Sequence, residues 1–160
     1  MIFNETLPLT LIVLALTLTT VYGGERKPVK PSEKDKCSVC GMFVAKYSDF
    51  LAEVIFKDGS TFFFDGTKDM FKYYFDLKKY NPSKKPEDID SIYVTDYYNL
   101  TLIDGVKSYY VAGSDVYGPM GRELIPFENE NDAKEFLKDH KGKSVLRFKE
   151  ITYETVKGLD

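Results

Sequence analysis

Residues 50–67 read FLAEVIFKDGSTFFFDGT, and this stretch decides the fold class. Its first eight residues alternate between two faces, which predicts a strand. The apolar face carries Phe50, Ala52, Val54 and Phe56, and the polar face carries Glu53 and Lys57. Asp58-Gly59 is typical of a hairpin turn, so residues 61–64 are expected to return as a second strand.

Helix and strand signals continue outward from this hairpin. Thr67 can cap a helix that runs to about Leu77, and residues 92–94 form a short strand after a loop. The predicted elements of the second part are a hairpin of 100–103 and 106–111 turning at Asp104-Gly105, a strand at 123–127, a helix from Asn129 to near His140, and a strand at 144–148. The pattern predicts an α+β fold of two similar strand-strand-helix-strand units, mostly antiparallel sheet with short helices. Their expected bounds are 37–98 and 99–160.

Composition limits the possible functions. The chain has 160 residues, 43% of them hydrophobic, which suits one compact domain or two small intertwined halves. The net charge is −3, and no Lys/Arg stripe stands clear of acids, so nucleic-acid binding is not expected. Two cysteines and one histidine cannot build a standard four-ligand Cys/His zinc site.

The N-terminus predicts export. Residues 9–18 form an apolar run about as long as a signal-peptide core, and we expect a signal peptide over 1–24. An uncleaved N-terminal anchor, which would give membrane association, is the alternative because no Lys or Arg precedes the run. No cysteine stands at the end of the run, so lipid attachment there is not expected. Residues 25–36 are charged, contain two prolines and are predicted to be a flexible tether.

The segment Cys37-Ser38-Val39-Cys40-Gly41-Met42 places three sulfur atoms within six residues. Thiolate and thioether sulfurs are soft donors that favour Cu(I) over hard cations. Gly41 lets the backbone turn tightly, so Cys40 and Met42 can face one ion. Two other readings stay open: a disulfide between Cys37 and Cys40 in a structural exported domain, or a thiol-disulfide oxidoreductase. The redox reading lacks a helix that begins at the second cysteine.

A second candidate ligand is Met120, within Tyr117-Gly118-Pro119-Met120-Gly121. A methionine between a proline and a glycine lies in a loop, where its side chain can point at a site. Filling a gap in the core is the alternative role. Met70 is expected in the core, and His140 is expected to cover the core or cap its helix rather than bind metal.

The sequence resembles the NosL family of nitrous-oxide reductase accessory proteins over roughly residues 35–150. The resembling residues are the Cys37–Met42 segment, Phe62-Phe63-Phe64-Asp65-Gly66, Ala112-Gly113-Ser114-Asp115, Gly118 to Phe127, and the closing Ala133, Phe136, His140 and Gly142.

The resemblance implies a periplasmic Cu(I) carrier without enzymatic activity. Its two similar α+β halves would be similar to part of the organomercurial lyases, although shared fold is weak warrant for lyase activity. The implied partner is apo nitrous-oxide reductase, whose copper-sulfide centre would receive the metal. The resemblance assigns metal binding first to Cys40 and Met120, and then to Cys37 and Met42. Many members look like lipoproteins, and this chain departs from them in having no cysteine after its apolar run.

Overall fold

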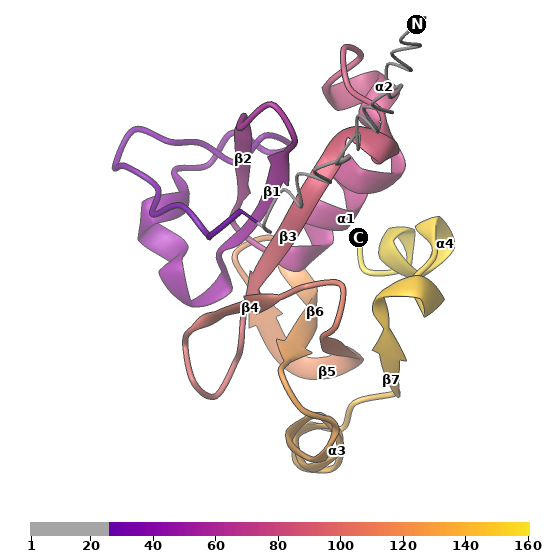
Figure 1. The fold of residues 1–160 in the computed structure, drawn as a ribbon. Helices are drawn as coiled ribbons and strands as arrows, with labels where there is room; N and C mark the ends of the chain where they lie inside the picture. Colours follow the sequence, from indigo (N-terminus) through magenta and orange to yellow (C-terminus); the bar gives the residue numbers. More distant parts are fainter. Residues whose placement is uncertain (1–25) are drawn as a thin grey trace, which may run out of the picture.

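The structure, a computed structural model, describes residues 26–160 and has two antiparallel sheets (Figure 1). The predicted signal peptide or anchor at 1–24 lies outside the described residues. Within 26–160, no helix is both long and apolar enough to cross a membrane.

The first unit builds a four-stranded sheet in the order β2-β1-β3-β4. Its elements are β1 (Ala52–Phe56), β2 (Thr61–Phe64), α1 (Thr67–Phe75), α2 (Leu77–Tyr80), β3 (Ile89–Thr95) and β4 (Leu102–Asp104), with 3₁₀ turns at Val44–Phe50 and Pro86–Asp88. The second unit builds a three-stranded sheet in the order β6-β5-β7. Its elements are β5 (Tyr109–Gly118), β6 (Gly121–Phe127), α3 (Glu130–Asp139), β7 (Ser144–Arg147), a 3₁₀ turn at Phe148–Glu150 and α4 (Tyr153–Lys157). The predicted α+β fold with two strand-strand-helix-strand units is confirmed.

The predicted hairpin between residues 100–103 and 106–111 is wrong. β4 pairs with β3 in the first sheet, whereas β5 pairs with β6 and β7 in the second. The Asp104 side chain accepts a hydrogen bond from the Val106 backbone at 2.9 Å, and the chain passes from one sheet to the other after this turn. β4 therefore belongs to the same sheet as β1, β2 and β3.

The helix predicted from Thr67 to about Leu77 needs correction at both ends. Gly66, not Thr67, occupies the N-cap position of α1, because the Thr67 hydroxyl donates instead to Glu123 at 2.9 Å and to the Leu124 carbonyl. The helix stops at Asp76, and a separate short helix α2 follows. In the second unit, Asn129 caps α3 by accepting from the Asp132 backbone at 3.0 Å, as predicted.

The alternation expected for residues 50–57 is absent, because both faces of β1 are covered. All five residues of β1 are buried, including Glu53, and α1 packs against this strand. The backbone N–H of Val29 donates to both Glu53 carboxylate oxygens at 3.1 Å. Residues 26–35, before Cys37, form no helix or strand, as expected of a tether. The hydrogen bonds of Val29 nevertheless join this segment to the sheet.

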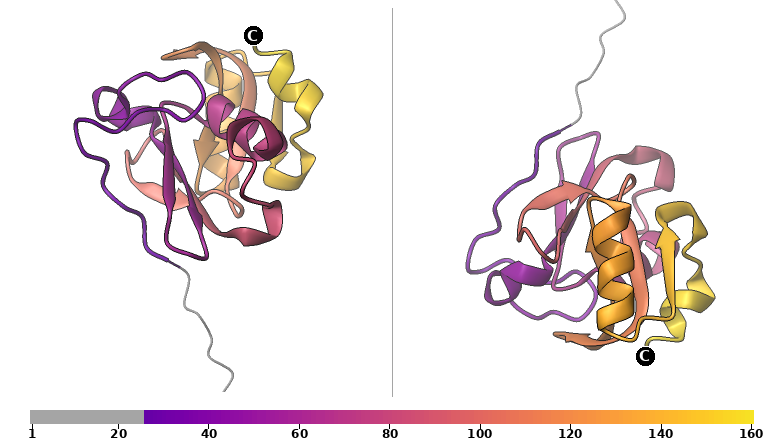
Figure 2. Two further views of the ribbon diagram at one scale, coloured as in Figure 1. Left: turned by 90° about the horizontal axis from the view of Figure 1, so that it is seen from above. Right: turned by 90° about the horizontal axis from the view of Figure 1, so that it is seen from below.

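The two sheets share one core. Alternate residues of β5 face opposite ways: Tyr110 and Ala112 join the large core of the first unit, and Val111 packs under α3. α1 contacts β1 and β2 of the first sheet and β6 of the second. α3 lies across the second sheet (Figure 2). This arrangement brings the start of α1 beside the β5–β6 hairpin.

Candidate metal centre

A tight loop presents the two cysteines at the edge of the first sheet. The Cys37 backbone N–H donates to the Met42 carbonyl at 2.7 Å, and the Gly41 N–H donates to the Cys37 carbonyl at 2.9 Å. Gly41 has φ +80°, which a residue with a side chain rarely adopts. Cys37 also forms a parallel bridge with Phe63 of β2. The loop is therefore fixed beside the strand that leads into α1.

Two carboxylates complete the cluster around the thiols. Asp65 follows β2, and its carboxylate lies 3.3 Å from the Cys40 Sγ. Asp69 lies in the first turn of α1, and its carboxylate lies 3.3 Å from the Cys37 Sγ. One ligand atom from each of the four side chains lies within 4.8 Å of the others. We call these four residues the thiol–carboxylate cluster.

The cluster is closed on one side and open on the other. Cys37, Asp65 and Asp69 are buried, whereas Cys40 is half-buried. Both cysteines are free thiols. Cys40 lies in a turn, and no helix begins at it, so the structure lacks the local context expected of a thiol-disulfide oxidoreductase.

Burial and charge keep both thiols protonated. Burial raises the pKa of Cys40 to about 11, and the neighbouring Asp65 carboxylate adds to the rise. Burial also raises the pKa of Cys37 far above its usual range. A metal ion that binds these sulfurs must therefore displace their protons. In the metal-free chain the S–H groups donate hydrogen bonds to the Asp65 and Asp69 carboxylates.

The two methionines occupy different positions. Met42 is half-buried and closes the cysteine loop through its backbone carbonyl. Met120 lies at the turn between β5 and β6, with 43% of its surface exposed. Its carbonyl accepts a hydrogen bond from the Lys68 ammonium at 2.8 Å, which joins the turn to the first turn of α1. Met70 is fully buried, as predicted.

His140 is half-buried and covers the apolar side chains beneath α3. Its ring stacks on Phe136 with centroids 4.3 Å apart, and its Nδ1 lies 3.1 Å from the Asp115 carboxylate. It is the residue that follows the last turn of α3. This position agrees with the expected role in covering the core.

Sequence reasoning missed Asp65 and Asp69 as members of the site. An acidic residue in the first turn of a helix is common for electrostatic reasons, so Asp69 carries no separate signal. Asp65 follows a strand and precedes a glycine, which reads as a turn. The sequence feature that pointed to Asp65 was its place in the Phe62–Gly66 segment, which is part of the family resemblance.

Comparison with known proteins identifies the family. A family model described as NosL matches residues 28–156, which is most of the chain. The chain belongs to the NosL family. The curated "Copper-binding lipoprotein NosL" of Stutzerimonas stutzeri is 30% identical over 162 residues, covering 89% of this chain and 78% of that protein.

Two solved structures of NosL proteins are similar to this one. The crystal structure of the copper chaperone NosL from Shewanella denitrificans has a TM-score of 0.66 at 24% identity, covering 80% of this chain and 97% of that chain. The solution structure of apo-NosL from Achromobacter cycloclastes has a TM-score of 0.47 at 27% identity, covering 66% and 87%. The Shewanella structure agrees with the NosL fold seen here.

Proposed function

We propose that this NosL-family chain is an exported accessory protein that carries Cu(I) on Cys40, Cys37, Met120 and Met42. Apo nitrous-oxide reductase or its maturation machinery would receive the metal. The Stutzerimonas relative is named a copper-binding lipoprotein and the Shewanella protein a copper chaperone, which supports copper as the cargo. The apolar run at residues 9–18 supports export to the periplasm, with or without a retained anchor.

The observation that carries the proposal is the thiol pair in a fixed loop. The ligand atoms of Cys37 and Cys40 lie within 4.8 Å of each other, and both residues are free thiols. Two sulfurs at that spacing suit a soft monovalent ion, and a thioether can add a third soft donor. The carboxylates are harder donors, so their main role toward Cu(I) would be to accept the thiol protons.

Uptake and release follow from the asymmetric burial of the two thiols. Binding of Cu(I) replaces the S–H proton of each cysteine, and Asp65 and Asp69 lie 3.3 Å from the sulfurs that lose them. The half-buried Cys40 is open to a ligand from an acceptor protein, while the buried Cys37 keeps hold of the ion. Transfer would then proceed by exchange of ligands, without any chemical turnover.

An anaerobic titration tests this function. Reduced full chain should bind about one equivalent of Cu(I) in competition with a chromophoric chelator. Cys40→Ser should weaken the affinity by about 100-fold and Met120→Ala by about 10-fold, since a lost ligand costs at least as much as a lost supporting group. Met70→Leu is the matched control, because this buried methionine belongs to the core. Wild-type affinity in Cys40→Ser would rule out the thiol site.

The same preparation tests the competing redox function. A thiol-disulfide oxidoreductase needs a nucleophilic thiolate, and the raised pKa of Cys40 disfavours one. We expect no catalysed reduction of a test disulfide. Turnover that depends on Cys40 would contradict the carrier assignment.

A further inference from the structure

Lys68 is a buried cation in an unfavourable place. Its side chain is 2% exposed, and it lies in the first turn of α1, where the helix dipole repels positive charge. A buried charge is costly unless it is well paired. Lys68 is not one of the proposed sulfur ligands, so its buried position needs another explanation.

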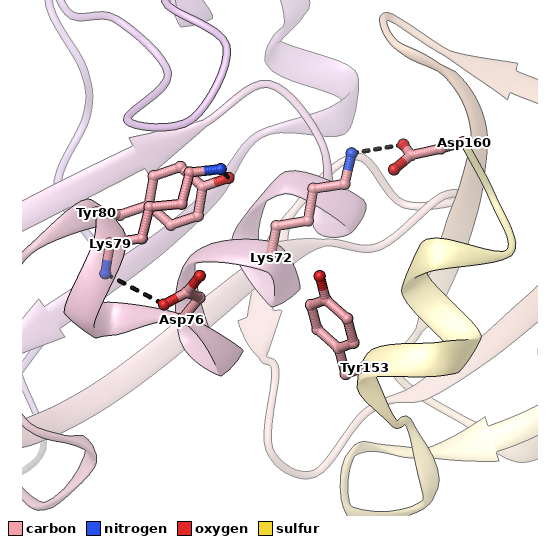
Figure 3. Close-up of a pocket in the computed structure, with 6 residues that line it drawn as sticks. All are labelled: Lys72, Asp76, Lys79, Tyr80, Tyr153 and Asp160. Carbon is pink, nitrogen blue, oxygen red and sulfur yellow. Dashed lines mark hydrogen bonds and ion pairs between the residues drawn. The ribbon is translucent and has the colours of Figure 1, made fainter.

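Two hydrogen bonds of Lys68 join the β5–β6 hairpin to α1. Its ammonium donates to the Met120 carbonyl at 2.8 Å, and its backbone N–H donates to the buried Glu123 carboxylate at 2.5 Å. Asp160 supplies the counter-charge, with its carboxylate 3.5 Å from the Lys68 ammonium. Asp160 also pairs with Lys72 at 2.5 Å, as Figure 3 shows. One lysine thus contacts both the hairpin turn and the strand that leaves it.

The outer part of the β5–β6 hairpin is separated from its regular ladder. The β5–β6 register shifts between Ala112 and Tyr117. Beyond the shift, the paired residues are Tyr117 with Arg122 and Gly118 with Gly121. The bonds from the Lys68 ammonium to the Met120 carbonyl and from the Lys68 N–H to Glu123 join this outer part to α1.

We propose that Lys68 is the positioning residue that holds the Met120 turn beside the thiol–carboxylate cluster. The proposal rests on the proposed function, because Met120 matters as a copper ligand. Lys68 is adjacent in sequence to Asp69, whose carboxylate contacts the Cys37 thiol. When Lys68 holds the turn in place, the Met120 thioether loses less conformational entropy on binding the ion. Lys68 would act on copper only through Met120.

A double-mutant comparison on the full chain tests the proposal. The variants are Lys68→Leu, Met120→Ala and the two combined, each titrated with Cu(I) against a chelator. Lys68→Leu should weaken Cu(I) binding by about 10-fold, as expected for a supporting group. The double variant should bind no more weakly than Met120→Ala alone. Lys134→Leu, the same change at an exposed lysine of α3, is the matched control and should retain wild-type affinity.

A measurement without copper gives a second readout. In a chain labelled with ¹³C at the methionine methyl groups, Lys68→Leu should move the Met120 signal and leave that of the core residue Met70 unchanged. Lys68→Gln, which keeps a donor at shorter reach, gives the same comparison if Lys68→Leu does not fold.

The outcomes separate this proposal from the proposed function. Wild-type affinity in Lys68→Leu together with a loss in Met120→Ala would overturn the positioning role. A further loss in the double variant would also overturn it, because Lys68 would then act on the thiolates by charge. If the wild-type chain binds no Cu(I), the carrier function fails, and an unmoved Met120 methyl signal in Lys68→Leu would independently contradict the positioning role of Lys68.

Discussion

At the scale of single residues, each thiol in the cluster faces a carboxylate. Ionising both cysteines beside Asp65 and Asp69 would place four negative charges within 4.8 Å. Burial and these neighbours therefore favour neutral thiols in the metal-free chain. A bound cation reverses that preference, because it supplies the charge that the thiolates need. Under the proposed function, the empty site would hold neutral thiols and would become a thiolate site when copper binds.

Replacing Asp65 should make Cys40 more reactive. Asp65→Asn removes the negative charge and the acceptor that favour the S–H form, so the pKa of Cys40 should fall from about 11. Burial remains the largest cause of the raised pKa, so the fall will be partial. Each unit by which the pKa of Cys40 falls gives about tenfold more thiolate at pH 8. The rate of Cys40 alkylation by iodoacetamide, followed by mass spectrometry, measures this. Asp76→Asn, at the end of α1, is the control, and an unchanged rate in Asp65→Asn would refute the effect.

The sequence was sufficient to predict the sulfur atoms but not the carboxylates. Cys37, Cys40 and Met42 are neighbours in the chain, so their convergence is a local property. The carboxylates come from residues 25 and 32 positions further on, and only the pairing of Cys37 with β2 brings them together. Met120 could be singled out because a glycine and a proline flank it. Its ligation of copper is still a prediction.

At the scale of elements, the start of α1 is fixed by a side chain from the other unit. The buried Glu123 carboxylate accepts from the Thr67 hydroxyl, the Lys68 N–H and the Leu124 N–H. These donors include an N–H that a helix start leaves without an internal partner. Glu123 thus replaces the cap that the sequence assigned to Thr67. Gly66 permits this approach, because an added Cβ would lie 2.1 Å from the Glu123 carboxylate.

Gly66→Ala should therefore destabilise the protein by about 2 kcal/mol, the usual cost of overpacking a buried site. The φ of Gly66 is ordinary extended backbone, so the cost is steric. Glu123 could move aside only by breaking its hydrogen bonds. Chemical denaturation measures the loss. Gly158→Ala is the matched control, because its nearest contact would be an ordinary 3.4 Å, and it should change stability by less than about 0.5 kcal/mol. Equal stability of the two variants would contradict the steric role.

The elements themselves were largely predictable, and their partners were less so. The Asp58-Gly59 hairpin and the Asn129 cap are decided by neighbouring residues, and both are found. β4 and β5 also flank a good turn sequence, Asp104-Gly105, yet they join different sheets. Local turn signals cannot distinguish a hairpin from a crossing between sheets, since that choice depends on which strand offers a free edge.

At the scale of the whole molecule, the two units are not independent. Tyr110 of the second sheet packs edge-on against Phe71 of α1, with ring centroids 5.3 Å apart, and Leu124 lies in the same core. The proposed copper site would depend on this union, since the thiols and carboxylates come from the first unit and Met120 from the second. The segment before the cysteines is tied to β1 of the first unit through Val29 and Glu53.

That last tie predicts how stability depends on pH. Burial raises the pKa of Glu53 to about 7, whereas an unfolded glutamate titrates near about 4.3. Between these values the folded chain keeps a proton that the unfolded chain has released, so stability falls as pH rises through this window. Below the window the carboxyl is neutral in both states and the penalty is absent. The fall should be on the order of 4 kcal/mol, because the two pKa values differ by roughly 2.7 units at about 1.4 kcal/mol per unit.

Glu53→Gln isolates this term, because the amide oxygen can still accept from the Val29 N–H but carries no charge. Urea unfolding between pH 4.5 and 8 should show a shallower decline for Glu53→Gln than for the wild type. Burial also raises the pKa of Glu123 to about 7, so part of the decline should persist until Glu123→Gln is added. Glu154→Gln, at an exposed position of α4, should leave the profile unchanged. A Glu53→Gln profile that parallels the wild type would show that the carboxyl is already ionised in the folded chain, and the contact with Val29 would then act as a bond to a charged group.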